Sequence, residues 1–407
     1  MPGMYRKLVI LLLLFSTFCA EAQSIRLTNH QAPTALYIDA ERIYNFNLYE
    51  RSRLELGLTW VVPNESCPNA KYFLGQWTFN GYGAYGFGDK DFKFGGSAQL
   101  RLPNKSQTRI AFLAFKDLER AASRRLSPYR MLSPSANTGY VSSRYVGVKG
   151  AELWLSSTPT RGFSYTVRAR QTWEDYRFDA SGLLYPTLHP EQQTPVRMFS
   201  ELTAQLRWTF GLTADARVGH VADTALAYYF RALVQYKASF DKYGLALFSQ
   251  LGFATPGTPY SRLFDVSGTS NATYFFKNTF LTVAPNTFTA NIFAHVCLNY
   301  TAPLPLWQTD WSAPHPFIQV NALWGHLFGQ DSDGWRQWEG LPLRSPYMGI
   351  VEPATGFNGL LHWGLLDMGF GVAYRICPQS ASYFREDPTK NFAFTIVADL
   401  ILDKYNK

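Results

Sequence analysis

Serine, histidine and acidic residues are the side chains with which this chain of 407 residues could catalyse a reaction or bind a metal. Its seven histidines show no H-E-x-x-H or comparable ligand spacing, and neither G-x-S-x-G nor a glycine-rich phosphate loop occurs. A hydrolase would need a serine and a histidine on adjacent strands, and the candidates are Ser249 or Ser164 with His220 or His295. No spacing selects one such pair, so we expect no enzyme, no metal site and no cofactor.

The segment 331–334, Asp-Ser-Asp-Gly, resembles a fragment of a calcium loop. Its spacing to Glu339 does not complete an EF-hand, and this composition is common in turns, so we expect a turn. It lies in a predicted loop over 327–360. That loop also carries three aromatic side chains, Trp335, Trp338 and Tyr347. They could bind a sugar or a partner, but packing of the loop against itself is the favoured interpretation.

Apolar and polar side chains alternate along residues 53–61, whose sequence is RLELGLTWV. Because successive side chains of a strand point to opposite faces, this segment predicts a strand with one apolar and one polar face. Similar segments recur along the chain, and 199–210 is among the clearest. In that segment we expect Ala204, Leu206 and Trp208 to face lipid and Gln205 and Arg207 to face inward.

The N-terminus has the features of a secretory signal peptide. Arg6 and Lys7 precede an unbroken apolar run over 8–15, and residues 20–22 form an A-x-A pattern before Gln23. The apolar run is far shorter than the ~20 residues of a membrane-spanning helix. We therefore expect cleavage after Ala22 and export of the chain.

An exported chain of alternating strands suits an outer membrane, because lipid satisfies no backbone hydrogen bonds and a spanning sheet must close on itself. The prediction is an all-β fold, a transmembrane antiparallel β-barrel of about 14 strands within a range of about 12 to 16. Aromatic residues make up 16% of the chain against only 17% charged residues, and aromatic girdles at the membrane interfaces would account for this aromatic excess. The expected organisation is a signal peptide over 1–22, a lead-in segment over 23–50 and the barrel over 51–407. The alternative is a soluble all-β sandwich.

Charged and polar side chains gather on the faces that would line the lumen of such a barrel. The predicted lumen-lining residues are Arg53, Glu55, Arg101, Arg168, Arg170, Glu201, Arg207, Arg231, Lys237, His295 and Asp399. Rings of charge set selectivity in channels. A ladder of internal salt bridges that fills a narrow lumen is the other interpretation, and the sequence leaves both open.

The chain has four cysteines. Cys19 leaves with the signal peptide and Cys297 falls in mid-strand, whereas Cys67 and Cys377 lie in the first and last hairpin connections. Closure of an even-stranded barrel would make those connections neighbours, and an oxidising compartment would let a disulfide persist. We therefore predict a candidate Cys67–Cys377 disulfide, with two free thiols as the alternative.

Several stretches carry a family resemblance. They are residues 49–58, the Gly- and aromatic-rich residues 81–95, Asp117-Leu118-Glu119, and residues 252–263. Together they resemble a Bacteroidetes outer-membrane β-barrel family of unknown function, whose barrel commonly follows a carboxypeptidase-regulatory-like domain. Here only residues 23–50 precede the barrel. The resemblance implies a barrel over most of 45–402 and implies no catalytic residues.

The sequence thus predicts a non-catalytic protein of the cell outer membrane, with a pore or transport role or an envelope-organising role. Its expected partners are outer-membrane lipid and the barrel-assembly machinery, and its protein partners are not identified by the sequence. The formal charge of +8 comes with no compact basic and aromatic patch, so we expect no nucleic acid partner. An outer-membrane hydrolase with a Ser/His site and a soluble periplasmic all-β binding protein are the alternatives.

Overall fold

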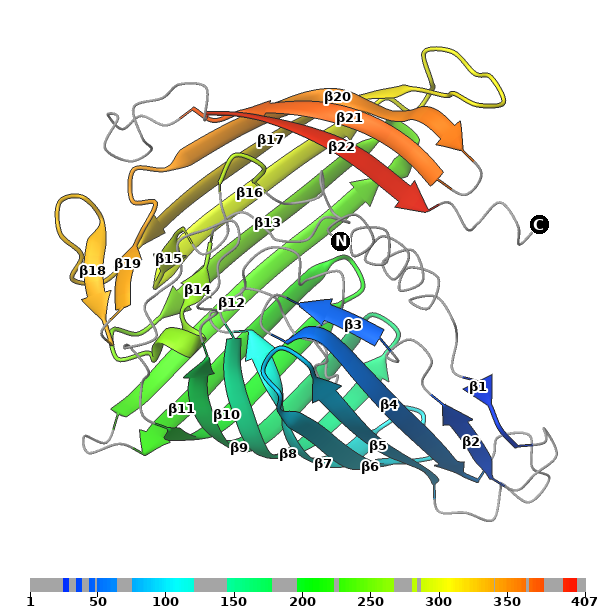
Figure 1. Ribbon diagram of the computed structural model, residues 1–407, viewed down its shortest axis with the longest axis vertical. Coiled ribbons are helices and arrows are strands. Elements are labelled where there is room, and N and C mark those ends of the chain that lie inside the picture. Colours follow the sequence, from blue (N-terminus) through cyan, green and yellow to red (C-terminus); the bar gives the residue numbers. More distant parts are fainter. Residues whose placement is uncertain are drawn as a thin grey trace, which may run out of the picture. The chain divides into compact units, whose positions relative to one another are not determined.

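The computed structural model describes residues 25–28, 34–38, 44–47, 50–63, 75–120, 145–177, 196–222, 227–266, 280–283, 287–339, 341–363, 366–376 and 391–400. Antiparallel strands dominate these residues (Figure 1), which confirms the predicted all-β class. Among them, no helix is long and apolar enough to cross a membrane. The predicted signal peptide and both Cys67 and Cys377 lie outside the described residues.

The chain divides into two compact units. Unit 1 comprises Met1–Ala121, Ser127–Leu206 and Arg217–Tyr228, and unit 2 comprises Ala122–Leu126, Arg207–Ala216 and Tyr229–Lys407. Three strands contribute residues to both units, namely β10 (Arg197–Trp208), β11 (Leu212–Ala222) and β12 (Ala227–Phe240).

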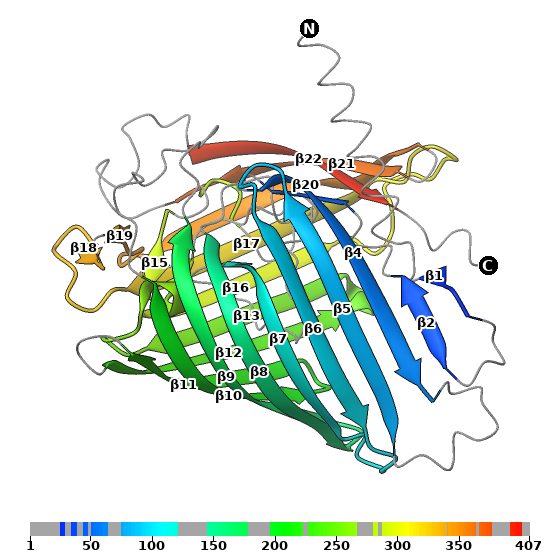
Figure 2. The same cartoon turned by 60° about the horizontal axis from the view of Figure 1, so that its bottom comes forward.

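Unit 1 holds a run of six long strands that lie side by side in chain order (Figure 2). They are β4 (Arg51–Val62), β5 (Gln76–Gly86), β6 (Phe92–Arg101), β7 (Arg109–Arg120), β8 (Tyr145–Thr160) and β9 (Phe163–Arg177). The lead-in segment adds three short strands, β1 (Ile25–Arg26), β2 (Ala35–Ile38) and β3 (Tyr44–Asn47). β2 and β3 both pair with β4 on the edge that β5 leaves open, so part of the lead-in belongs to the sheet.

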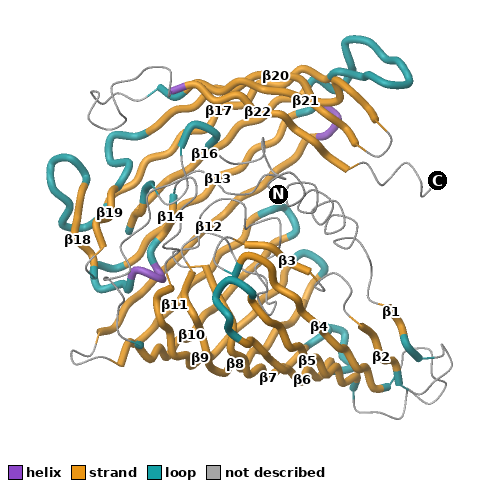
Figure 3. Tube along the Cα trace, in the orientation of Figure 1, coloured by secondary structure: helices purple, strands orange, loops and turns teal. Residues whose placement is uncertain are grey.

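Unit 2 continues the up-and-down pattern after β12. Its long strands are β13 (Leu245–Ala254), β16 (Ile292–Thr301), β17 (His315–His326), β20 (Ile350–Trp363), β21 (Leu366–Tyr374) and β22 (Phe392–Leu400). Each pairs antiparallel with the next. Two small two-stranded sheets lie in the connections, one formed by β14 (Phe264–Asp265) and β15 (Thr289–Ala290) and the other by β18 (Trp335–Trp338) and β19 (Leu341–Arg344). The only named helical elements of the described residues are the short turns η5 (Asp241–Tyr243) and η6 (Tyr260–Arg262) (Figure 3).

The described residues contain fifteen strands of nine residues or more, one more than the predicted 14. The additional strand is β20, which corrects the predicted loop over 327–360 from residue 350 onward. Pro353 lies inside β20 and pairs with Val320 of β17, and Gly356 and Gly359 follow it in the same strand. Proline and glycine are depleted in strands, so local composition concealed a strand that its pairing with β17 stabilises.

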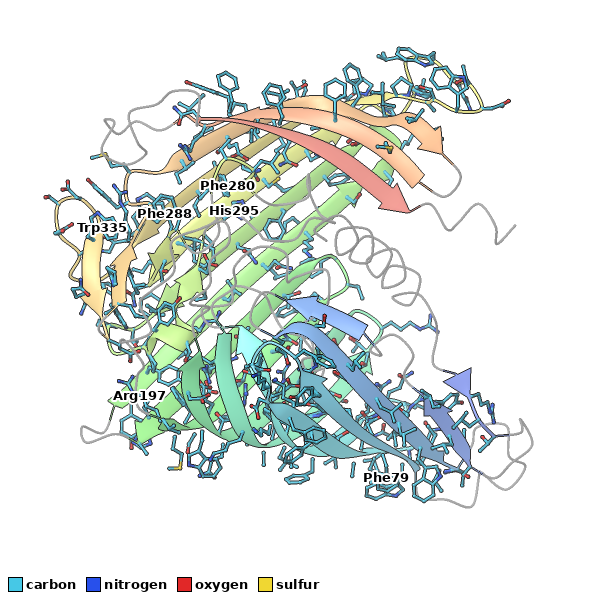
Figure 4. The ribbon with its side chains drawn as sticks, viewed as in Figure 1. Phe79, Arg197, Phe280, Phe288, His295 and Trp335 are labelled. Carbon is cyan, nitrogen blue, oxygen red and sulfur yellow. The ribbon has the colours of Figure 1, made fainter. Side chains whose placement is uncertain are left out.

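Burial along the strands is the reverse of that in a water-soluble sheet. In β4, Arg53 and Glu55 are buried, whereas Leu54 and Leu56 are 48% and 57% exposed. In unit 2, His295 of β16 is buried and the next residues of its outer face, Val296 and Leu298, are exposed. We call the buried polar side of each unit its inner face and the exposed apolar side its outer face. Figure 4 shows aromatic side chains such as Phe79 on the outer face of unit 1.

Candidate functional site

A fully buried arginine, Arg53 near the start of β4, is the centre of a group of charged side chains on the inner face of unit 1. Its guanidinium binds the Asp117 carboxylate of β7 through two hydrogen bonds, Nη1 to Oδ1 at 2.6 Å and Nη2 to Oδ2 at 3.0 Å. Nε and Nη2 also donate to Oε2 of Glu55, at 3.1 and 2.9 Å, and Nη1 donates to Oε1 of Glu50 at 3.3 Å. Bidentate arginine–carboxylate pairs combine strength with fixed geometry, so Arg53 links β4 to β7 in one defined arrangement.

Tyr82 of β5 reaches the same carboxylate across the intervening strand β6. Its hydroxyl donates to Oδ2 of Asp117 at 2.5 Å. The ring passes over Gly95, the residue opposite Tyr82 in β6, where an added Cβ would lie 2.5 Å from Cε1 of the ring. A glycine at this position therefore leaves the space through which the tyrosine crosses the sheet.

Lys93 of β6 extends the network toward the turn after β5. Its ammonium lies 2.7 Å from Oε1 of Glu50 and 2.6 Å from Oδ2 of Asp89. We call the connected set the Arg53 cluster; its members are Glu50, Arg53, Glu55, Tyr82, Asp89, Lys93 and Asp117. Buried charges require partners and hydrogen bonds, and here each cation of the cluster contacts at least two carboxylates.

Further ion pairs continue along the inner face of unit 1. They join Arg170 to Glu119, Arg168 to Glu152 at 3.8 Å, and Arg217 to Glu201 at 3.1 Å. The guanidinium of Arg170 also lies over the Phe115 ring, 5.4 Å from its centroid. The pairs Arg168–Glu152 and Arg217–Glu201 join neighbouring strands, whereas Arg170 of β9 reaches Glu119 of β7 across β8. Ion pairs between strands therefore recur along the inner face of unit 1.

The inner face of unit 2 is covered by a segment of its own chain, which we call the inner segment and which includes the described residues 255–266, 280–283 and 287–290. The carboxylate of Glu352, fully buried on β20, holds it. It accepts the backbone N–H groups of Leu281 at 2.9 Å and Thr282 at 2.8 Å, and the Thr282 hydroxyl. Arg375 donates to the Thr282 carbonyl at 2.7 Å from Nη1. A buried carboxylate and a guanidinium from the sheet therefore satisfy both sides of one turn of the inner segment.

Aromatic contacts complete the packing of the inner segment on the sheet. Phe264 lies 5.0 Å from the Phe293 ring of β16, and the Arg231 guanidinium lies over Phe264 at 4.4 Å. Phe280 lies 5.3 Å from the buried His295 ring (Figure 4). On β13, a Cβ added at Gly252 would meet Phe293 at 2.1 Å. Glycine thus gives these rings room against the strands.

The hairpin β18–β19 packs on the same segment. The Trp338 indole N–H donates to the Thr258 carbonyl at 3.1 Å, and Oε2 of Glu339 accepts the Tyr260 backbone N–H at 3.1 Å. Asp331 instead accepts backbone N–H groups of its own turn, including that of Trp335 at 2.8 Å. Asp331 of the calcium-loop fragment and Glu339 therefore bind different parts of the chain. The contact of Trp338 with Thr258 agrees with the interpretation that the predicted loop packs against its own chain.

The remaining predicted lumen-lining residues occupy varied environments. Arg231 lies 3.9 Å from Asp215, and the exposed Lys237 lies over the Phe248 ring at 5.6 Å. Arg101 is partly buried and Arg207 is exposed. Asp399 stands opposite Asp367 in the β21–β22 pairing, and its side chain lies outside the described set. The burial alternation of β10 holds through Gln205 and ends before Arg207.

Sequence reasoning missed four residues that organise these two inner faces, namely Tyr82, Asp117, Glu352 and Arg375. Asp117 and Tyr82 could have been found as polar groups on strand faces, but the binding of both Tyr82 and Arg53 to Asp117 depends on the register of four strands. Glu352 falls in the predicted loop over 327–360, so the sequence gave no reason to place its side chain on the inner face of a strand.

The serine and histidine candidates for hydrolysis do not share a face in unit 2. Ser249 pairs with Val296, whereas His295 pairs with Gln250, so the two side chains point to opposite sides of the β13–β16 pair. In unit 1, the His220 ring contacts Tyr228 at 4.7 Å. Ser164 is the second residue of β9, whereas His220 lies near the end of β11.

No family model and no curated protein matches this sequence. Among solved structures, the chain is similar to BamA from Haemophilus ducreyi lacking POTRA domains 1–3, with a TM-score of 0.50 and 11% identity over 91% of this chain and 71% of that one. CdiB from Escherichia coli gives 0.45 and 11% over 91% and 63%, and CdiB from Acinetobacter baumannii gives 0.41 and 11% over 86% and 57%. The chain thus spans less than two thirds of either CdiB. These neighbours are outer-membrane β-barrel proteins, and at such identity the likeness to BamA concerns the fold alone.

Proposed function

We propose that this chain is an outer-membrane β-barrel protein whose interior is closed at rest by its own side chains and by the inner segment. The reversed burial carries this proposal. Arg53 and Glu55 are buried while Leu54 and Leu56 are exposed, and the same alternation recurs in unit 2. Such an outer face is unfavourable in water and favourable in hydrocarbon, where a spanning sheet has an apolar exterior and a polar interior. The barrel fold of BamA supports the same conclusion.

The proposed role is transport by a route that opens when the inner segment moves. The contacts of Glu352 and Arg375 with Thr282 support this role, because they are made to a segment rather than between barrel strands. A substrate is not identified by any contact of the described residues. The proposed role involves no catalysis. The resemblance to the Bacteroidetes outer-membrane barrel family stays a prediction.

An envelope-organising role is the second candidate, and the Arg53 cluster favours it. Its charges are satisfied by one another rather than directed at a solute. A barrel of this kind serves as a rigid scaffold and requires no passage through its centre.

Membrane fractionation tests the location. We expect the protein in the outer-membrane fraction, with heat-modifiable migration on gels and a mature N-terminus at Gln23. Recovery in the soluble periplasmic fraction would contradict the proposal and favour the soluble alternative.

Planar-bilayer conductance separates the two roles. The wild-type protein should show no steady open pore, and Glu352→Ala should produce intermittent conductance because the inner segment loses its anchor. A Glu339→Gln variant is the matched control, since it changes another carboxylate that binds the same segment at Tyr260. Silent bilayers for Glu352→Ala, with release of the segment shown by proteolysis, would favour the envelope role.

A further inference from the structure

One connection of unit 2 differs from the others at its end of the sheet. The turn between β12 and β13 occupies residues 241–244, and β20 and β21 are separated by 364–365. The connection between β16 and β17 occupies 302–314, and we call it the 302–314 loop. Outer-membrane barrels have short turns on the periplasmic side and long loops outside. The 302–314 loop is therefore a long connection on the short-turn side.

The 302–314 loop exposes large apolar side chains. These are Leu304, Leu306, Trp307 and Trp311, which are 78%, 58%, 50% and 60% exposed. The loop contains one charged residue, Asp310. Contiguous exposed apolar groups mark an interaction surface.

Hydrogen bonds hold this surface in shape. The Trp307 indole N–H donates to Oγ of Ser312 at 3.2 Å, and that hydroxyl donates to the Leu360 carbonyl of β20 at 2.7 Å. The His362 backbone N–H donates to the Trp311 carbonyl at 2.7 Å. Because these hydrogen bonds attach the backbone of the loop to β20, the apolar side chains of the loop stay exposed.

The apolar surface is continuous with the outer face of unit 2. Leu298 and Tyr300 are exposed at the end of β16 and lead directly into the loop. The neighbouring turn adds Phe240 and Tyr243, at 49% and 64% exposure. Its Gly244 carbonyl accepts the N–H of Thr301, the last residue of β16 before the loop, at 2.7 Å. Lys242 on that turn supplies a cation suited to a lipid phosphate.

We infer that the 302–314 loop is a membrane anchor that inserts its leucines and tryptophans into the headgroup region of the periplasmic leaflet. Tryptophan and tyrosine favour this region, where an apolar body and a polar N–H or O–H group are both accommodated. The inference rests on the proposed function, because the outer face must itself lie in a bilayer. Continuity with that face identifies lipid, rather than a soluble partner, as the occupant.

The test places an environment-sensitive fluorophore at single cysteines in the protein reconstituted into phosphatidylcholine–phosphatidylglycerol vesicles. The background carries Cys67→Ser and Cys377→Ser, and the buried Cys297 must stay unlabelled without an added cysteine. The labelled variants are Leu304→Cys in the loop, Leu56→Cys on the outer face of β4, and Lys105→Cys in the polar turn between β6 and β7 as the control. Quenching is measured with doxyl-labelled lipid and with iodide.

We expect lipid quenching at position 304 comparable to that at 56, and iodide quenching at 105. Lipid quenching at 56 with iodide quenching at 304 would overturn the anchor and leave the proposed function intact. Shielding of 304 from both quenchers would also overturn it, because a second copy or another protein would then cover the loop. Absence of lipid quenching at 56 would contradict the proposed function itself, and the anchor with it.

Discussion

The two units bury polar side chains on the same kind of sheet face but satisfy them differently. In unit 1, Arg53 and Asp117 join strands of the sheet directly. In unit 2, Glu352 binds the backbone of the inner segment at Leu281 and Thr282. Loss of a charge in unit 1 takes a partner from other buried charges, whereas loss of Glu352 removes contacts to a segment that is not part of the sheet. We therefore expect the contacts of unit 1 to hold its strands in one arrangement, and those of unit 2 to let the inner segment move while the strands stay in place.

Arg53→Met should give the largest effect. It leaves Glu50, Glu55 and Asp117 close together without their shared cation, and removal of one partner from a buried ion pair costs about 3–5 kcal/mol. Denaturant unfolding of the protein in detergent or lipid measures the loss. Arg161→Met, at the exposed turn between β8 and β9, is the control and should be near neutral. Unchanged stability of Arg53→Met would mean that unit 1 does not depend on the cluster.

An arginine on the outer face tests whether both units face lipid alike. Leu56→Arg in unit 1 and Val296→Arg in unit 2, both in the middle of a strand, should each cost about 2–4 kcal/mol near the bilayer midplane. Unfolding of the lipid-reconstituted protein measures the cost. Leu304→Arg in the loop should cost about 0–1 kcal/mol, as expected near an interface. A penalty confined to one unit would show that the comparison of the two outer faces is wrong.

Glu352→Ala should affect the inner segment before the strands. The amides of Leu281 and Thr282 lose a charged acceptor, and hydrogen bonds to charged groups contribute about 1.5–3 kcal/mol. Hydrogen exchange at these two amides should accelerate, and proteases should cut the inner segment while the strands stay protected. Glu339→Gln is the control, because it changes a carboxylate outside the segment that binds the segment elsewhere, at Tyr260. Simultaneous exchange of the strands and the segment would indicate that unit 2 is as tightly coupled as unit 1.

The strands were predictable where their outer faces repeat with period two, because that signal lies within a single segment such as 53–61. β20 was not, since Pro353, Gly356 and Gly359 conceal it and its pairing with β17 is a long-range property. The contacts at the two inner faces join residues that are even farther apart in the sequence. Arg53 and Asp117 are 64 residues apart, and Glu352 and Thr282 are 70 apart. Sequence patterns gave the charged faces, but only strand register and the path of the inner segment select the partners.

Apart from the controls and the loop variant, Tyr82→Phe should give the smallest effect, and it tests how evenly the Arg53 cluster shares its bonds. The change removes the hydroxyl that donates to Asp117 and keeps the ring over Gly95. Asp117 retains both bonds from Arg53, so the loss should be that of one hydrogen bond, about 0.5–1.5 kcal/mol. Tyr85→Phe, on the outer face of the same strand, should be smaller still because its ring is exposed. Unfolding of both variants under one set of conditions makes the comparison. A Tyr82→Phe penalty as large as that of Arg53→Met would place the hydroxyl, rather than the guanidinium, at the centre of the interactions that hold unit 1 together.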